Sequence, residues 1–171
     1  SFNGTNTTSG EISLTNTAGT LTVAQISQAG GGNVTVSNTG NLTNTGTVST
    51  GGNGNIALQA TSGNLTTTGN VTAGGSGTVG LTTVTAGNVV ANSAVSSTSG
   101  AITANSAGTI GGTGTFGTSG LLTTSSVGGT TLTNANTVGS FNGTNTTSGE
   151  ISLTNTAGTL TVAQISQAGT G

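Results

Sequence analysis

Two glutamates are the only Asp, Glu, Lys, Arg or His side chains in this chain of 171 residues. Glu11 and Glu150 lie far apart in the sequence, and the chain also lacks Cys and Tyr. Acid–base and nucleophilic catalysis need titratable groups held close together, and one isolated carboxylate without a base does not meet that need. The sequence therefore predicts that the chain is not an enzyme and has no catalytic residues. We expect both glutamates to be solvated at the surface, because an unpaired Glu is rarely buried.

The same shortage of chemical groups argues against most ligands. Metal sites need clusters of His, Cys, Asp or Glu, so we expect no metal and no cofactor. Nucleic acids and anionic membranes are bound through Lys and Arg, which are absent. Base stacking needs exposed aromatic side chains, and the chain offers only Phe2, Phe116 and Phe141. We therefore expect no nucleic-acid partner. We expect no membrane insertion either, because no apolar stretch is long enough to span a bilayer.

The two glutamates occupy the same position of a long repeat. Residues 1–30 recur letter for letter as residues 140–169, which defines a 139-residue period. We interpret residues 1–171 as a single uncapped segment of a longer tandem array. A repeat of this kind indicates a building material rather than a unique binding site.

A shorter repeat lies inside the long one, as is typical of solenoid proteins. Cutting at the glycine-rich clusters gives segments of 22, 22, 23, 23, 20 and 29 residues: 11–32, 33–54, 55–77, 78–100, 101–120 and 121–149. Most open with apolar residues two apart, as in Ile12 and Leu14, which predicts a strand with one buried side. Four segments then carry a Gly, an apolar residue two positions later and another six further on, as in Gly40, Leu42 and Val48.

Three short strands per segment, separated by corners rich in Gly, Asn and Ser, predict an all-β fold. We expect a right-handed parallel β-helix, a three-faced β-solenoid of about seven coils with 20–29 residues each. Right-handed winding is expected from the crossover rule for parallel strands. Gly suits the corners because it adopts positive φ freely, and Asn tolerates positive φ better than most residues. A six-coil period should advance roughly 29 Å along the axis, from the spacing of neighbouring strands.

The longest segment departs from the regular coil length. Residues 121–149 should carry an extra loop of about six residues beyond an ordinary coil, and Phe2 and Phe141 should pack such a loop against the shaft.

Disorder is the alternative for a chain so rich in Thr, Ser, Asn and Gly. The regular apolar spacing and the abundance of strand-forming Thr and Val favour the β-solenoid.

The chain resembles the β-helical shafts of filamentous-haemagglutinin-type proteins of two-partner secretion and of related autotransporter adhesins. The likeness is carried by GEISLTNTAGTLTV (residues 10–23), GNVTVSNTGNLTNTGTV (32–48) and GNIALQATSGNLTTTGNV (54–71). It implies an exported bacterial protein at the cell surface, with roles in attachment and aggregation. No catalytic or binding residue carries over, and the near-absence of charge departs from such shafts.

Three functions remain open. The first is a structural shaft in a long extracellular fibre, which associates with itself, while regions outside this segment bind any cell-surface or glycan partner. The second is an adhesin that binds a host glycan directly, although sugar sites usually need aromatic or carboxylate groups. The third is an ice-binding solenoid, prompted by Thr-x-Thr pairs such as Thr15 and Thr17, Thr20 and Thr22, Thr43 and Thr45, and Thr131 and Thr133. Unequal segment lengths should spoil the register that ice binding requires.

Overall fold

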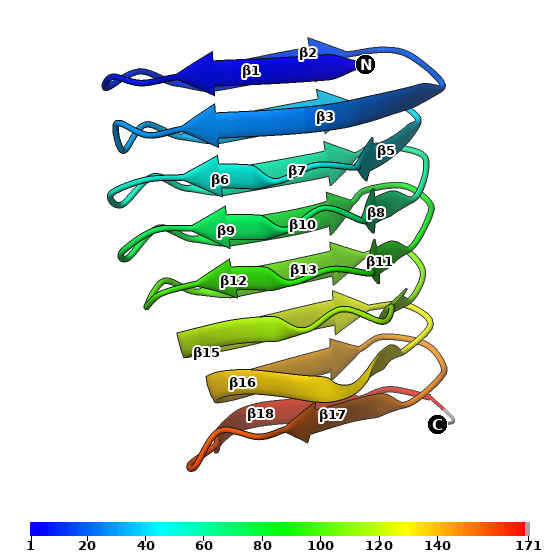
Figure 1. Cartoon of the computed structure of the whole chain (residues 1–171). Coiled ribbons are helices and arrows are strands. Elements are labelled where there is room, and N and C mark those ends of the chain that lie inside the picture. Colours follow the sequence, from blue (N-terminus) through cyan, green and yellow to red (C-terminus); the bar gives the residue numbers. More distant parts are fainter. Residues whose placement is uncertain (170–171) are drawn as a thin grey trace.

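Residues 1–169, which the computed structural model describes, form eighteen strands and no helix. The strands wind into a parallel β-solenoid of about eight turns (Figure 1). The fold is therefore all-β, as predicted. No part of the described chain is a helix long and apolar enough to cross a membrane.

Strand pairing arranges the chain into three ladders, each running along the solenoid axis. The first ladder contains β2 (Ile12–Asn16), β4 (Val34–Asn38), β7 (Ile56–Ala60), β10 (Val79–Thr83), β13 (Ile102–Ser106), β15 (Phe116–Ser126), β16 (Thr130–Asn145) and β18 (Thr161–Gln167). The second contains β3 (Thr20–Gln28), β5 (Asn41–Asn44), β8 (Leu65–Thr67), β11 (Val89–Ala91), β14 (Ile110–Gly111), β16 again and β17 (Ile151–Asn155). The third contains β1 (Phe2–Asn6), β3 again, β6 (Val48–Thr50), β9 (Val71–Ala73), β12 (Val95–Ser97), β15 and β16.

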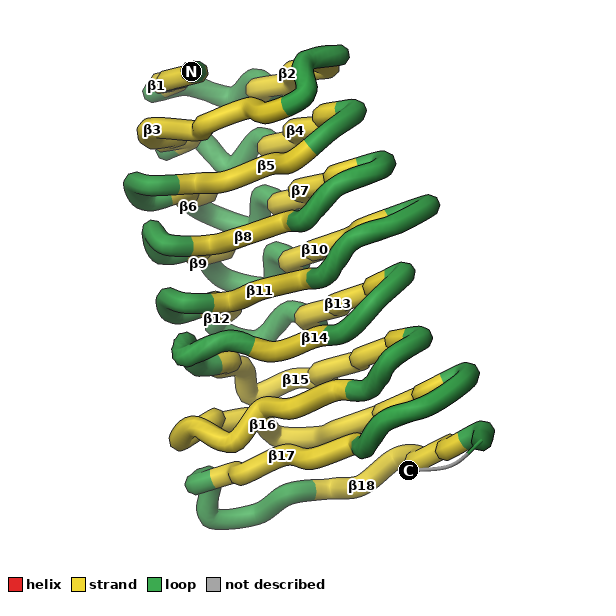
Figure 2. The backbone as a smooth tube through the Cα atoms, turned by 90° about the vertical axis from the view of Figure 1, so that its right-hand side faces the viewer, coloured by secondary structure: helices red, strands yellow, loops and turns green. Residues whose placement is uncertain are grey.

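The handedness of the solenoid follows from the path of the chain. In Figure 1 the third ladder runs leftward in front, the first ladder runs rightward behind it, and each turn lies below the last. This descent is right-handed, as the crossover rule predicts. Figure 2 looks onto the second ladder, with β5, β8, β11 and β14 stacked toward the viewer.

The period-two pattern identified the inward side chains correctly. Val34 and Val36 of β4 are fully buried, and Thr35 between them is exposed. Each inward residue stacks on the equivalent residue of the next coil, so that Val34 pairs with Ile56 and Ile56 with Val79. The core is therefore a set of apolar columns, and each interior coil buries its apolar edge against the coils on either side.

Steric crowding explains why a glycine precedes the second-ladder strands. A Cβ atom on Gly40 would fall on the carbonyl group of Gly19, and one on Gly87 would fall on that of Gly63. Gly87 also has φ of +100°, a conformation that side-chain-bearing residues rarely adopt. This close approach of corner to corner explains why the Gly recurs two residues before the apolar residue.

Asparagine serves the corners differently from the prediction. Among residues 1–169, every residue with positive φ is a glycine, so Asn does not supply left-handed corners. Its side chains instead bridge consecutive coils. The Asn41 amide oxygen accepts from the Asn64 N–H at 2.9 Å, and the Asn64 oxygen accepts from the Asn88 N–H at 2.8 Å. The position favours Asn because its short amide reaches a backbone donor one coil away.

The expected extra loop in residues 121–149 is absent, and the prediction was wrong for a simple reason: the segment holds more than one coil. Residues 122–126 of β15 pair with β13 on the first ladder, residues 130–132 lie on the second, and residues 141–145 pair with 122–126 and return to the first. The first-ladder step from Leu122 to Phe141 is shorter than the step from Ile12 to Val34. No coil of this segment is therefore longer than an ordinary one.

The repeat does not contain a whole number of coils. Six steps along the first ladder lead from Ile12 to Phe141. The repeat counterpart of Ile12 is Ile151, which lies on the second ladder, where it pairs with Thr130. The long repeat unit thus spans six coils and one further ladder step, and the expected six-coil period was too short. Figure 2 shows the shift: β17 lies on the near side below β14 and β16, whereas its counterpart β2 lies farther back, above β4.

Two buried threonines offer a test of the hydrogen bonding in this core. The Thr124 hydroxyl is buried beside Ala104 and has no hydrogen-bond partner. The Thr118 hydroxyl donates to the Gly100 carbonyl oxygen at 2.7 Å and accepts from the Gly120 N–H at 2.9 Å.

We predict that Thr124→Val raises the free energy of unfolding by about 1 kcal/mol, because valine has the same shape and no unpaired hydroxyl. Thr118→Val should lower it by about 1–3 kcal/mol, because the buried Gly100 carbonyl and the half-buried Gly120 N–H lose their partner. Chemical denaturation monitored by circular dichroism measures both changes. Equal destabilisation by the two variants would contradict the assignment for Thr124.

Candidate functional site

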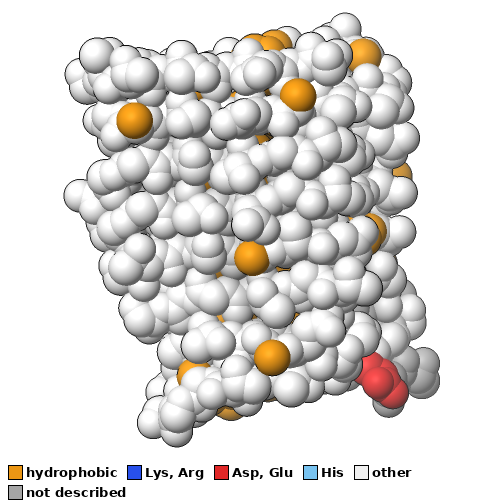
Figure 3. Space-filling model, in the orientation of Figure 1, with side chains coloured by type: hydrophobic (Ala, Val, Ile, Leu, Met, Phe, Trp, Pro, Cys, Tyr) orange, Lys and Arg blue, Asp and Glu red, His pale blue; other side chains and the backbone are white. Residues whose placement is uncertain are grey.

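The two carboxylates lie in separate, exposed parts of the surface. Glu11 precedes β2, where the Asn33 side-chain amide donates to its Oε1 at 3.1 Å. Glu150 precedes β17 in the last coil and is also exposed. No group of three or more His, Cys, Asp or Glu occurs within the described chain. The surface shown in Figure 3 is almost entirely uncharged, with one acidic spot at the end that holds the C-terminus.

The three phenylalanines do not form an aromatic platform. Phe116 and Phe141 are buried in the core, and Phe2 is half-buried in the first strand. Phe141 pairs with Leu122 on the first ladder, and Phe2 pairs with Val23. Both were expected to pack an extra loop, and Phe141 is instead an ordinary member of a core column.

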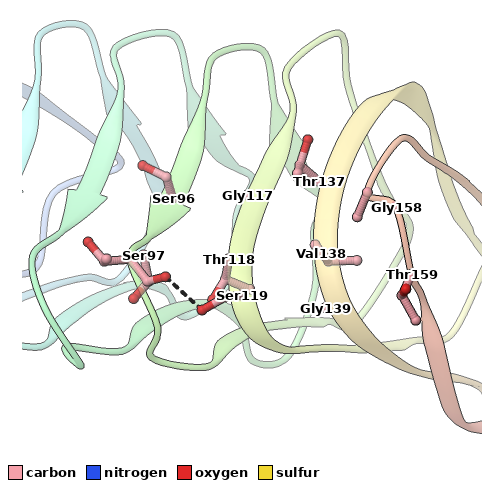
Figure 4. A pocket seen from close by; sticks show the side chains of 12 residues that line it. Ser96, Ser97, Gly117, Thr118, Ser119, Thr137, Val138, Gly139, Gly158 and Thr159 are labelled. Carbon is pink, nitrogen blue, oxygen red and sulfur yellow. Dashed lines mark hydrogen bonds between the residues drawn. The ribbon is translucent and has the colours of Figure 1, made fainter.

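A shallow groove of about 550 Å³ crosses the outer side of the third ladder (Figure 4). Its wall is made of hydroxyl-bearing and small residues, which come from β12, β15, β16 and the turn before β18: Ser96, Ser97, Thr98, Gly117, Thr118, Ser119, Thr137, Val138, Gly139, Ala157, Gly158 and Thr159. Ser119 Oγ is already engaged, because it donates to the Thr98 carbonyl oxygen at 3.0 Å. The groove contains neither a carboxylate nor an aromatic ring, so it offers no general acid, no general base and no sugar-stacking surface.

The Thr-x-Thr pairs do not form one regular array. Thr22 on the second ladder pairs with Thr43. Thr15 pairs instead with Ser37, and Thr131 pairs with Ser152. The outward positions that follow Thr43 on the second ladder are Thr66, Val90 and Gly111. This column is therefore not a continuous threonine surface.

Among the large apolar side chains of the described residues, the two with the highest exposed fraction lie in the last coil. Val162 and Ile165 of β18 are 57% and 50% exposed. Their repeat counterparts Val23 and Ile26 are 0% exposed, because Asn44 and Val48 of the next coil stack on them. Identical residues thus lie in the core where a following coil covers them and at the surface where none does.

A second hollow, of about 390 Å³, opens on the same coil. It is lined by Glu150, Ile151, Ser152, Ile165 and Gln167. This surface was not among the predicted sites. The sequence repeat could have revealed it. Each of these residues has a counterpart in the first repeat, where the apolar periodicity predicts that another coil stacks on it.

Comparison with known proteins gives this site no precedent. No protein-family model, no curated protein sequence and no solved structure matches the chain.

We predict a large difference between two identical substitutions at the same repeat position. Ile26→Ala should lower the free energy of unfolding by about 2–5 kcal/mol, because it leaves a cavity in a buried column. Ile165→Ala should change it by no more than about 0.5 kcal/mol, because half of that side chain is already in water. Urea denaturation of both variants gives the comparison. Similar losses would mean that the last coil is as well covered as the first.

Proposed function

We propose that this chain is a structural segment of a long extracellular shaft, built from tandem copies of the 139-residue unit and without enzymatic activity of its own. One observation carries the proposal: the same 30 residues form strands at both ends of the solenoid, and the last copy leaves exposed the apolar residues that the first copy buries. The exposed apolar residues of the last copy are suited to be covered by a further copy of the repeat unit.

The outer surface supports a passive, self-associating role. It carries two carboxylates and no cation, and its columns of Asn, Thr and Ser present matched hydrogen-bond donors and acceptors. Shafts with so little charge repel each other weakly, so lateral association of parallel copies meets little electrostatic resistance. The lack of Lys and Arg also removes every cleavage point for trypsin-like proteases, which favours exposed extracellular material.

The biological setting is proposed from the resemblance to filamentous-haemagglutinin-type shafts. In that setting the segment acts as a spacer at a bacterial cell surface and holds an adhesive region away from the cell. Direct glycan binding is less well supported, because the groove on the third ladder lacks aromatic and acidic groups. Ice binding is less well supported as well, because the threonine pairs do not form a continuous column.

We predict that arrays of one, two and four units form rods whose length grows by about 30 Å per unit, from the strand spacing and the coils in each unit. Electron microscopy of negatively stained arrays measures the growth. Globules of unchanged length would overturn the shaft proposal. In parallel, the 171-residue chain should pass through columns of immobilised glycans without delay, and specific retention would favour the adhesin instead.

A further inference from the structure

We propose that the last coil, β17–β18, is a docking surface for a coil with the sequence of residues 32–50, and that the docked unit is turned by one ladder relative to the unit before it. This inference rests on the proposed shaft function. It adds the partner segment, the contacts it makes and its orientation.

The partner is specified by the first repeat. The hollow on the last coil is lined by Glu150, Ile151, Ser152, Ile165 and Gln167. Their counterparts are Glu11, Ile12, Ser13, Ile26 and Gln28. In the first repeat Ile12 and Ser13 are paired with Val34 and Thr35, and Ile26 and Gln28 with Val48 and Thr50. The segment that fills the hollow therefore carries the same sequence as the one that covers the first repeat.

The last coil already makes one contact that the covered coil of the first repeat makes. Gln167 Nε2 donates to the Gly149 carbonyl oxygen at 2.9 Å. The equivalent Gln28 side chain donates to the carbonyl oxygen of Gly10, the counterpart of Gly149. The same hydrogen bond thus closes the covered coil and the uncovered one. Docking needs little rearrangement of this end, which lowers its entropic cost.

Glu150 supplies a polar contact at the edge of the apolar surface. In the first repeat the Asn33 amide donates to Glu11 Oε1 at 3.1 Å. The counterpart of Asn33 in a docked unit would reach Glu150 in the same way. Hydrogen bonds to a carboxylate are stronger than those between neutral groups, so this contact favours one register over its neighbours.

The orientation follows from the position of the last coil in the ladders. Ile12 and its cover Val34 lie on the first ladder, whereas Ile151 lies on the second. A segment that covers Ile151 as Val34 covers Ile12 must therefore lie on the second ladder. Each unit is turned by one ladder, and the surface pattern returns to its starting side after three units, about 90 Å along the axis at the usual strand spacing.

The docking contact can be tested by thiol protection in a chain that has no natural cysteine. Residues 31–139 are appended after Gly169, and Val162→Cys is placed in both the extended and the original chain. The rate of maleimide labelling should fall about tenfold or more on extension, because the side chain becomes a core residue. Val84→Cys is the matched control, since Val84 is 48% exposed on a side loop and should react equally in both chains. Equal labelling at position 162 in both chains would overturn the docking surface.

The turn between units needs a separate readout. Thr35 is exposed on the first ladder, and Thr35→Cys is introduced together with the same change at its counterpart in the appended unit. Gold-cluster labels viewed by cryo-electron microscopy should lie on different sides of the rod, about 30 Å apart along its axis. Labels on one side of a lengthened rod would overturn the turn and leave the shaft proposal intact. If extension does not lengthen the rod at all, the shaft proposal itself fails.

Discussion

Stacking of one coil on the next is the interaction on which every other feature of this molecule depends. A single coil has a thin apolar edge on each side and cannot bury it alone. The backbone has the same need, because parallel strands find their hydrogen-bond partners only in neighbouring coils. The repeat gives a direct comparison. Val23 and Val162 occupy the same position in two identical 30-residue copies, and only Val23, on which the following coil stacks, is buried. Stability in this fold is therefore a property of neighbours, not of a single coil.

The composition, rich in Asn, Thr and Ser and poor in charge, suits parallel stacking. Equivalent residues of successive coils lie one strand spacing apart, so a column of like charges would place them about 4.8 Å apart. Each such contact would cost about 1 kcal/mol even in water, and the cost accumulates along a column. Asn, Thr and Ser avoid this repulsion because each carries both a donor and an acceptor. Asn16 donates to Asn38 at 2.8 Å, and Ser96 donates to Thr72 at 3.2 Å. A nearly uncharged chain avoids this repulsion wherever like residues are stacked on like.

Much of the fold could be predicted from the sequence because its local rules are strict. Alternation at Val34 and Val36 identified inward residues, and the spacing of Gly40, Leu42 and Val48 identified the second- and third-ladder strands. The number of coils per unit could not be obtained in this way. The six-coil prediction implied that repeat counterparts lie on the same ladder, but Ile12 lies on the first ladder and Ile151 on the second. The bridging role of Asn was missed for a related reason, since a hydrogen bond to the following coil leaves no signal in the local sequence.

The shift between Ile12 and Ile151 shows how little the three ladders differ as environments. The second-ladder column that receives Ile151 contains Leu42, Leu65, Val89, Ile110 and Thr130, and the first-ladder column of Ile12 contains Val34, Ile56, Val79, Ile102, Leu122 and Phe141. Both columns accept β-branched and other apolar side chains once per coil. The spacing of strands and corners along the chain, more than the identity of any one core residue, therefore determines whether a coil fits. Such tolerance allows one unit to stack on another in a new orientation. It also allows a repeat whose length is not a whole number of coils to continue without a break in the solenoid.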